Sequence, residues 1–226
     1  VIIPVTVDVN SPKFLDSSPL TGSFLQGVVE INVQLEEPNV DEWRVKINGS
    51  DIPNNTGSTN LVSVQWDTAA VTNDGPQTID VIVEDLAGNT STKTLNVTVD
   101  RIKPSITILA PTESTIIRPA QLVAVIVEIE DQFNNSMDDT GIDVVLREMD
   151  NTFLARVPRQ SINRSGNTLT FTGRYRQGLS WPTQMKLVVT AVDRAGNQAV
   201  QQEVVLTTAS ARSRENRGWT FGWLGW

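Results

Sequence analysis

The sequence predicts an all-β protein of two tandem β-sandwiches with an aromatic C-terminal tail, and three observations support this fold class. Apolar and polar residues alternate over short runs, for example residues 29–35 and 78–84, as they do in strands with one buried face. Turn-forming pairs such as Asn48-Gly49 and Gly88-Asn89 separate the runs. Two sequence markers occur twice, which indicates a duplicated unit.

The first marker is Val-Thr-Val-Asp with a proline four positions after the aspartate, and the second is Asp-x-Ala-Gly-Asn. They stand at residues 5–8 with Pro12 and 97–100 with Pro104, and at residues 85–89 and 193–197. The first pair is offset by 92 residues and the second by 108, so the second unit is longer by 16 residues.

These offsets set the expected domain boundaries. We expect domain 1 at residues 1–99, domain 2 at residues 100–208 and the tail at residues 209–226. The extra length of the second unit is expected in two polar stretches, residues 132–140 and 159–167, which we predict to be loops.

Both markers, together with Trp66-Asp67 leading to Asp74-Gly75, resemble the bacterial Ig-like domains of surface adhesins. The resemblance covers residues 5–208, twice over, and implies immunoglobulin-like sandwiches that act as spacing or adhesive units. Trp43 stands where the third strand of such a sandwich runs, and we expect its side chain in the core.

Composition excludes several kinds of catalysis. The chain has no His and no Cys, which excludes Ser-His-Asp and Cys-His machinery and the common zinc and copper sites. Carboxylate chemistry remains, and its densest group is Glu128, Glu130, Asp131, Asp138 and Asp139. A solvated strand edge and loop explains this group better than a glycosidase pair. We therefore predict that the protein is not an enzyme.

Charge is unevenly distributed along the chain. Residues 1–100 carry 4 basic and 14 acidic side chains, a net −10, whereas residues 101–208 carry 11 of each. The tail is net +2, with three Arg against one Glu. An acidic first half repels phosphate backbones, so no nucleic-acid partner is expected, but it suits divalent cations.

Four aspartates are candidate calcium ligands. Asp8 and Asp100 lie at the unit boundaries, and Asp85 and Asp193 open the repeated hairpins. Hard cations prefer carboxylate and carbonyl oxygens, and the resemblance to adhesin stalks implies calcium near such boundaries. Aspartate also starts turns by capping backbone N–H groups, and that alternative stays open.

The tail is the strongest candidate for partner docking. Its aromatic and apolar side chains and one arginine are of the types that anchor interfaces. They are Arg217, Trp219, Phe221, Trp223, Leu224 and Trp226. Three interpretations are open: strand addition to another protein subunit, contact with a membrane interface, or a tail that packs on its own second domain or is the cut end of a longer chain.

We therefore expect a non-catalytic extracellular structural or adhesive module that docks to protein subunits through its tail. The alternatives are an extrinsic accessory subunit of a larger membrane or surface complex and, third, a carbohydrate-binding sandwich. The chain opens Val-Ile-Ile-Pro without a signal peptide, which we interpret as a mature exported chain at the cell surface, outside the cell or in the periplasm. No apolar run approaches the ~20 residues that a transmembrane helix needs.

Overall fold

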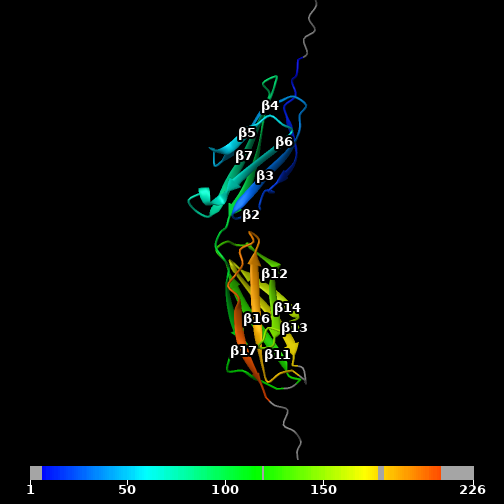
Figure 1. The fold of residues 1–226 in the computed structure, drawn as a ribbon, viewed down its shortest axis with the longest axis vertical. Coiled ribbons are helices and arrows are strands. Elements are labelled where there is room, and N and C mark those ends of the chain that lie inside the picture. Colours follow the sequence, from blue (N-terminus) through cyan, green and yellow to red (C-terminus); the bar gives the residue numbers. More distant parts are fainter. Residues whose placement is uncertain (1–6, 119, 178–180, 210–226) are drawn as a thin grey trace, which may run out of the picture. The chain divides into compact units, whose positions relative to one another are not determined.

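The computed structural model describes residues 7–118, 120–177 and 181–209, which form two compact units (Figure 1). Unit 1 is the chain up to Pro104 together with Asp131–Gly141 and Val192–Ala199. Unit 2 is, among the described residues, Ser105–Glu130, the described part of 142–191 and residues 200–209. The all-β prediction is confirmed, because strands are the regular secondary structure of the described residues apart from the short 3-10 helix Thr68–Ala70.

Two sheets build the first sandwich. Its strands are β1 (Lys13–Ser18), β2 (Phe24–Leu25), β3 (Val28–Glu36), β4 (Val40–Ile47), β5 (Ser50–Gly57), β6 (Leu61–Asp67), β7 (Gly75–Asp85) and β8 (Thr90–Val99). One sheet has the order β1-β3-β6 and the other β2-β8-β7-β4-β5. All pairs are antiparallel except β2 with β8.

The second sandwich repeats this plan. Its strands are β9 (Ser105–Ala110), β10 (Ile116–Ile117), β11 (Leu122–Glu130), β12 (Met137–Arg147), β13 (Phe153–Arg156), β14 (Arg159–Ser165), β15 (Thr168–Arg176), β16 (Gln184–Asp193) and β17 (Gln202–Thr208). The sheet orders are β14-β15-β11-β9 and β10-β17-β16-β12-β13. Here the parallel pair is β10 with β17, the counterpart of β2 with β8.

The core of the first sandwich follows from the alternation in its strands. Ile31, Val33 and Leu35 of β3 are buried, and in the register Ile31 lies opposite Val64 of β6. Trp43 of β4 is also buried, which confirms the core position expected for it. Alternate residues of a strand point to one face, so this pattern supplies one apolar layer of the sandwich.

The prediction of a loop over residues 159–167 is wrong. Residues Arg159–Ser165 form β14, which pairs with β15. β14 is an outermost strand of its sheet. Ile162 is partly buried, and the other residues of β14 are exposed. Such a polar edge strand lacks the apolar alternation that marks a half-buried strand, so its sequence is typical of a loop. The other predicted loop, residues 132–140, is irregular up to residue 136 and then enters β12.

Within the described ranges, no helix is long and apolar enough to cross a membrane.

Candidate metal centres

The repeated Asp-x-Ala-Gly-Asn marker is a tight turn that its own aspartate organises. Between β7 and β8, Asp85 Oδ1 accepts hydrogen bonds from the backbone N–H groups of Ala87 and Asn89, both at 2.9 Å. Gly88 lies at φ +84°, in the left-handed region that favours glycine. The turn therefore needs the acceptor at its first position and glycine at its fourth.

The second copy of the marker uses the same hydrogen bonds. Asp193 Oδ1 accepts from the Asn197 backbone N–H at 2.8 Å, and Gly196 lies at φ +90°. In both turns the asparagine side chain also donates to the other oxygen of its aspartate, at 2.8 Å for Asn89 and 2.7 Å for Asn197. Asp85 and Asp193 therefore cap backbone N–H groups of their turns, as the turn-capping interpretation expects.

Each asparagine also holds the boundary aspartate of the first marker. Asn89 Nδ2 donates to the backbone oxygen of Asp8 at 3.3 Å, and Asn197 Nδ2 donates to that of Asp100 at 2.9 Å. The two markers, far apart in sequence, therefore meet in space in both copies.

This meeting gathers carboxylates into two groups. In the first, oxygens of Asp8, Glu37 and Asp85 lie within 4.8 Å of one another. The second group, which we call the Asp100 cluster, contains Asp100, Asp131 and Asp193. Their carboxylate oxygens also lie within 4.8 Å of one another, and all three side chains are buried. The four predicted calcium ligands thus fall into two groups, Asp8 with Asp85 and Asp100 with Asp193, and each group contains a third acid.

Three buried carboxylates this close repel one another and lose hydration, and both effects disfavour the charged forms. Burial raises the pKa of Asp100 to about 6, the charges of Asp131 and Asp193 add to the rise, and a hydrogen bond from Gln132 opposes it. Burial also raises the pKa of Asp193. In the first group, by contrast, the Asn89 side chain lowers the pKa of Asp85.

Asp100 has one satisfied and one unsatisfied oxygen. Its Oδ1 accepts from Gln132 Nε2 at 2.8 Å and from the Ile102 backbone N–H at 3.3 Å. Its Oδ2 is buried and has no hydrogen-bond partner among the described residues. Buried polar atoms are rarely left unpaired, so this oxygen marks a place where a proton or a cation belongs.

The donor set fits a hard cation. Ca²⁺ takes six to eight oxygen ligands, and the Asp100 cluster offers three carboxylates from three segments, after β8, after β11 and at the end of β16. Oxygens that already accept one hydrogen bond keep a second lone pair, so the turns and a cation can share Asp193.

Sequence reasoning missed Glu37 and Asp131. Glu37 lies in the tight β3–β4 connection, and its Oε1 accepts from the Asn39 backbone N–H at 2.9 Å. Asp131 follows β11 directly, and the sequence places it only in the group of five acidic residues that a solvated strand edge and loop explains. Their positions in the repeat could have revealed them. Glu37 directly follows β3, Asp131 directly follows the corresponding strand β11, and the two acids are 94 residues apart.

The predicted docking residues of the tail lie outside the described residues: Arg217, Trp219, Phe221, Trp223, Leu224 and Trp226.

Comparison with known proteins identifies the fold. No family model matches the sequence, and no curated protein matches it. The fibronectin(III)-like modules of Clostridium thermocellum CbhA are similar in structure, with a TM-score of 0.56 and 13% identity over 91% of this chain and 97% of theirs. An I-band fragment of titin has a TM-score of 0.43 at 12% identity, covering 89% of this chain and 66% of that one.

The class that these observations define is the tandem immunoglobulin-like β-sandwich. The chain consists of such domains in series, as its sequence repeats predict.

Proposed function

We propose that this chain is a non-catalytic structural and adhesive module of an extracellular surface protein. In this proposal calcium occupies its carboxylate clusters, and its Trp-rich tail docks to other protein subunits. The observation that carries the proposal is the Asp100 cluster, where three buried carboxylates meet and one oxygen has no partner among the described residues. A module that spaces or holds needs stable strand ends, and no turnover.

Calcium in the Asp100 cluster would cross-link three strand ends that are distant in sequence. It would neutralise charges whose burial is otherwise unfavourable, so its binding energy adds to folding stability. The group of Asp8, Glu37 and Asp85 occupies the same place in the first repeat, and the proposal extends to it. Asp8 is only partly buried, which favours weaker binding there than at Asp100.

The experiment for this part is thermal unfolding of the full chain in chelator and in millimolar CaCl₂. We expect calcium to raise Tm by several degrees in the wild type and by much less in Asp100→Asn. Mg²⁺, which demands tighter octahedral geometry, is the matched control ion and should act more weakly. An equal calcium effect on wild type and variant would refute the assignment of the Asp100 cluster.

The proposed docking role of the tail rests on its composition. Three of the six tryptophans of the chain lie in its last eight residues, and large exposed aromatic surface marks contact sites. Light scattering of the intact chain and of a version ending at Thr208, each with and without liposomes, tests this part. Assembly of the intact chain alone supports protein docking, and vesicle binding alone supports the membrane alternative. Identical behaviour of the two chains would refute a docking tail.

An extrinsic accessory subunit of a larger surface complex is the second candidate. The same tail would anchor it, but partners other than the chain itself would co-purify with the full-length protein from its native source.

A further inference from the structure

An open groove runs between the two outermost strands of the first sandwich, β5 and β6. Two adjoining cavities of about 680 and 540 Å³ form it, and Ile52, Pro53, Trp66 and Ala70 line both. β5 is an edge strand of one sheet, and β6 is an edge strand of the other. Among the described strands, the outer edge of each therefore has no pairing partner in its own sheet. We call this feature the β5–β6 groove.

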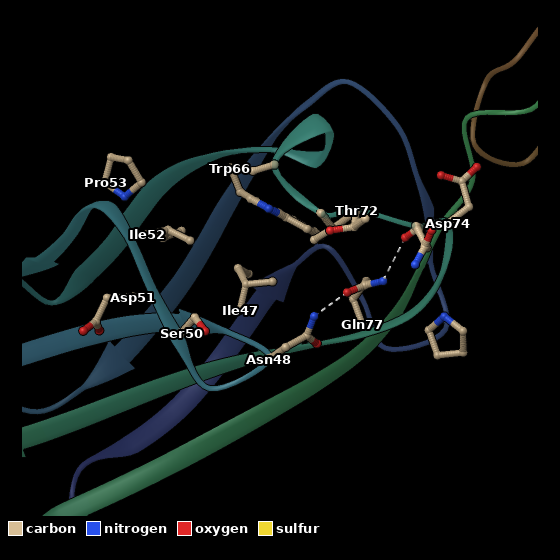
Figure 2. A pocket seen from close by; sticks show the side chains of 14 residues that line it. Ile47, Asn48, Ser50, Asp51, Ile52, Pro53, Trp66, Thr72, Asp74 and Gln77 are labelled. Carbon is tan, nitrogen blue, oxygen red and sulfur yellow. Dashed lines mark hydrogen bonds between the residues drawn. The ribbon is translucent and has the colours of Figure 1, made fainter.

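An apolar patch forms part of the groove, beside polar side chains such as Asn48 and Gln77. Figure 2 shows Ile47, Ile52 and Trp66 gathered around one space, from β4, β5 and β6. Val28, at the start of β3, extends the apolar lining and is 66% exposed. The Trp66 indole N–H is buried and has no hydrogen-bond partner among the described residues. An apolar patch of this kind suits an aromatic or extended peptide segment.

The rim of the groove is acidic. Asp51 lines the first cavity and Asp67 lines the second, whereas Asp74, which also lines the first, is already ion-paired with Arg101. The Asp51 side chain is 61% exposed, and its ion pair with Lys46 is long, at 3.9 Å. These carboxylates belong to a stretch whose net charge over residues 1–100 is −10. A cationic peptide is therefore the complementary partner.

The tail of this chain has the matching chemistry. Residues 210–226 contain Arg212, Arg214 and Arg217 against the single Glu215, followed by the alternating aromatics Trp219, Phe221 and Trp223. Alternating side chains suit an added strand, which offers one face to a groove and its backbone to an open sheet edge. Arg and Trp are also the residue types most common at interface hot spots.

We propose that residues 217–226 of a second copy of this chain bind in the β5–β6 groove, so that copies associate head to tail. This inference rests on the proposed docking role of the tail and names its acceptor. The two surfaces in the contact are different, so each copy can donate a tail and accept one. Contacts of this heterologous kind produce rings or open filaments.

A labelled synthetic peptide of residues 210–226 tests the acceptor directly by fluorescence anisotropy against the full-length chain. We expect the double variant Val28→Lys/Ala70→Lys to bind the peptide at least about tenfold more weakly, because it removes apolar contact and repels arginine. Both positions are exposed, so the fold tolerates lysine there. Leu15→Lys on β1, 53% exposed, is the matched control and should bind within about twofold of the wild type.

The second arm is the association of the chain itself, measured by sedimentation velocity over a range of concentrations. We expect concentration-dependent species in the wild type, and loss of them in Trp219→Ser/Trp223→Ser and in Val28→Lys/Ala70→Lys. Raising the salt concentration should weaken both peptide binding and association severalfold, since rim charges are screened.

The outcomes separate this inference from the proposed function. If the tail variants abolish association but the groove variants do not, the tail docks elsewhere and the β5–β6 groove is refuted as its acceptor. If the peptide does not bind and the intact chain stays monomeric, self-association is refuted. Binding of sugars in the groove, with no binding of peptide, would likewise overturn the inference.

Discussion

The side chain of Asn197 donates a hydrogen bond of 2.9 Å to the backbone oxygen of Asp100, 97 residues earlier in the chain. The other hydrogen of the same amide nitrogen serves Asp193 Oδ2 at 2.7 Å. One asparagine thus fixes both the hairpin that carries Asp193 and the strand end that carries Asp100. The repeat of this arrangement at Asn89 explains why both sequence markers occur twice.

Replacing Asn197 should therefore destabilise the fold more than replacing Asn89. Asn197→Ala leaves a buried backbone oxygen and a buried carboxylate without their donor, which costs about 2 kcal/mol. Asn89 is less covered and its bond to Asp8 is longer, so Asn89→Ala should cost about 1 kcal/mol or less. Urea unfolding of the full chain in chelator measures both differences. Equal losses would show that the bond to Asp100 adds nothing to the turn itself.

The pKa of Asp100 makes the stability of the metal-free protein depend on pH. Its folded pKa of about 6 lies above the ordinary value of 3.8, so the folded state holds this proton more tightly than the unfolded chain. The contribution of Asp100 to the free energy of unfolding should fall by about 3 kcal/mol as the pH rises from about 4 to just above 6. Asp193, whose pKa is also raised, acts in the same direction. Asp74 and Asp85, whose pKa values are lowered, act in the opposite direction and only below pH 3.8.

Asp100→Asn supplies the check on this pH dependence. The amide cannot ionise and its N–H₂ can donate to the neighbouring carboxylates, so in chelator at pH 7 the variant should be more stable than the wild type. Stability curves from chemical denaturation between pH 4 and 8 compare the two. A parallel fall in the variant would assign the dependence to other groups.

Gly57 is predicted to be required by packing rather than by backbone conformation. A Cβ at this position would overlap the indole of Trp43. Gly57→Ala should therefore displace the buried indole and destabilise the first sandwich by about 1–3 kcal/mol, the usual cost of overpacking.

Gly88→Ala is the matched comparison. Space around Gly88 is open, but its φ of +84° is unfavourable for alanine, so the expected cost is about 1 kcal/mol from strain alone. Near-ultraviolet circular dichroism should change in Gly57→Ala and not in Gly88→Ala. An unchanged tryptophan signal in both variants would contradict the assigned packing of Trp43.

The fold was accessible from the sequence because its signals are local or repeated. Alternation in β3 and β7 and glycine-containing turns such as residues 85–89 each predict their own segment. β14 was missed because a polar edge strand gives no alternation, and its pairing with β15 is a tertiary effect.

The candidate site was predictable only in part. Asp8, Asp85, Asp100 and Asp193 stand in repeated markers, but the markers alone do not predict which of these aspartates meet. Glu37 and Asp131 belong to no marker, and their approach depends on where β3 and β11 end in the folded sandwich. The unpaired oxygen of Asp100 results from three-dimensional packing alone.

Calorimetric titration of calcium into the chelator-treated full chain, wild type against Asp100→Asn, tests the central claim most directly. The account predicts saturable calcium binding in the wild type, with proton release when the titration is made near pH 6, and loss of the tighter site in the variant. Absence of saturable binding in the wild type, or identical isotherms for the two proteins, would contradict it.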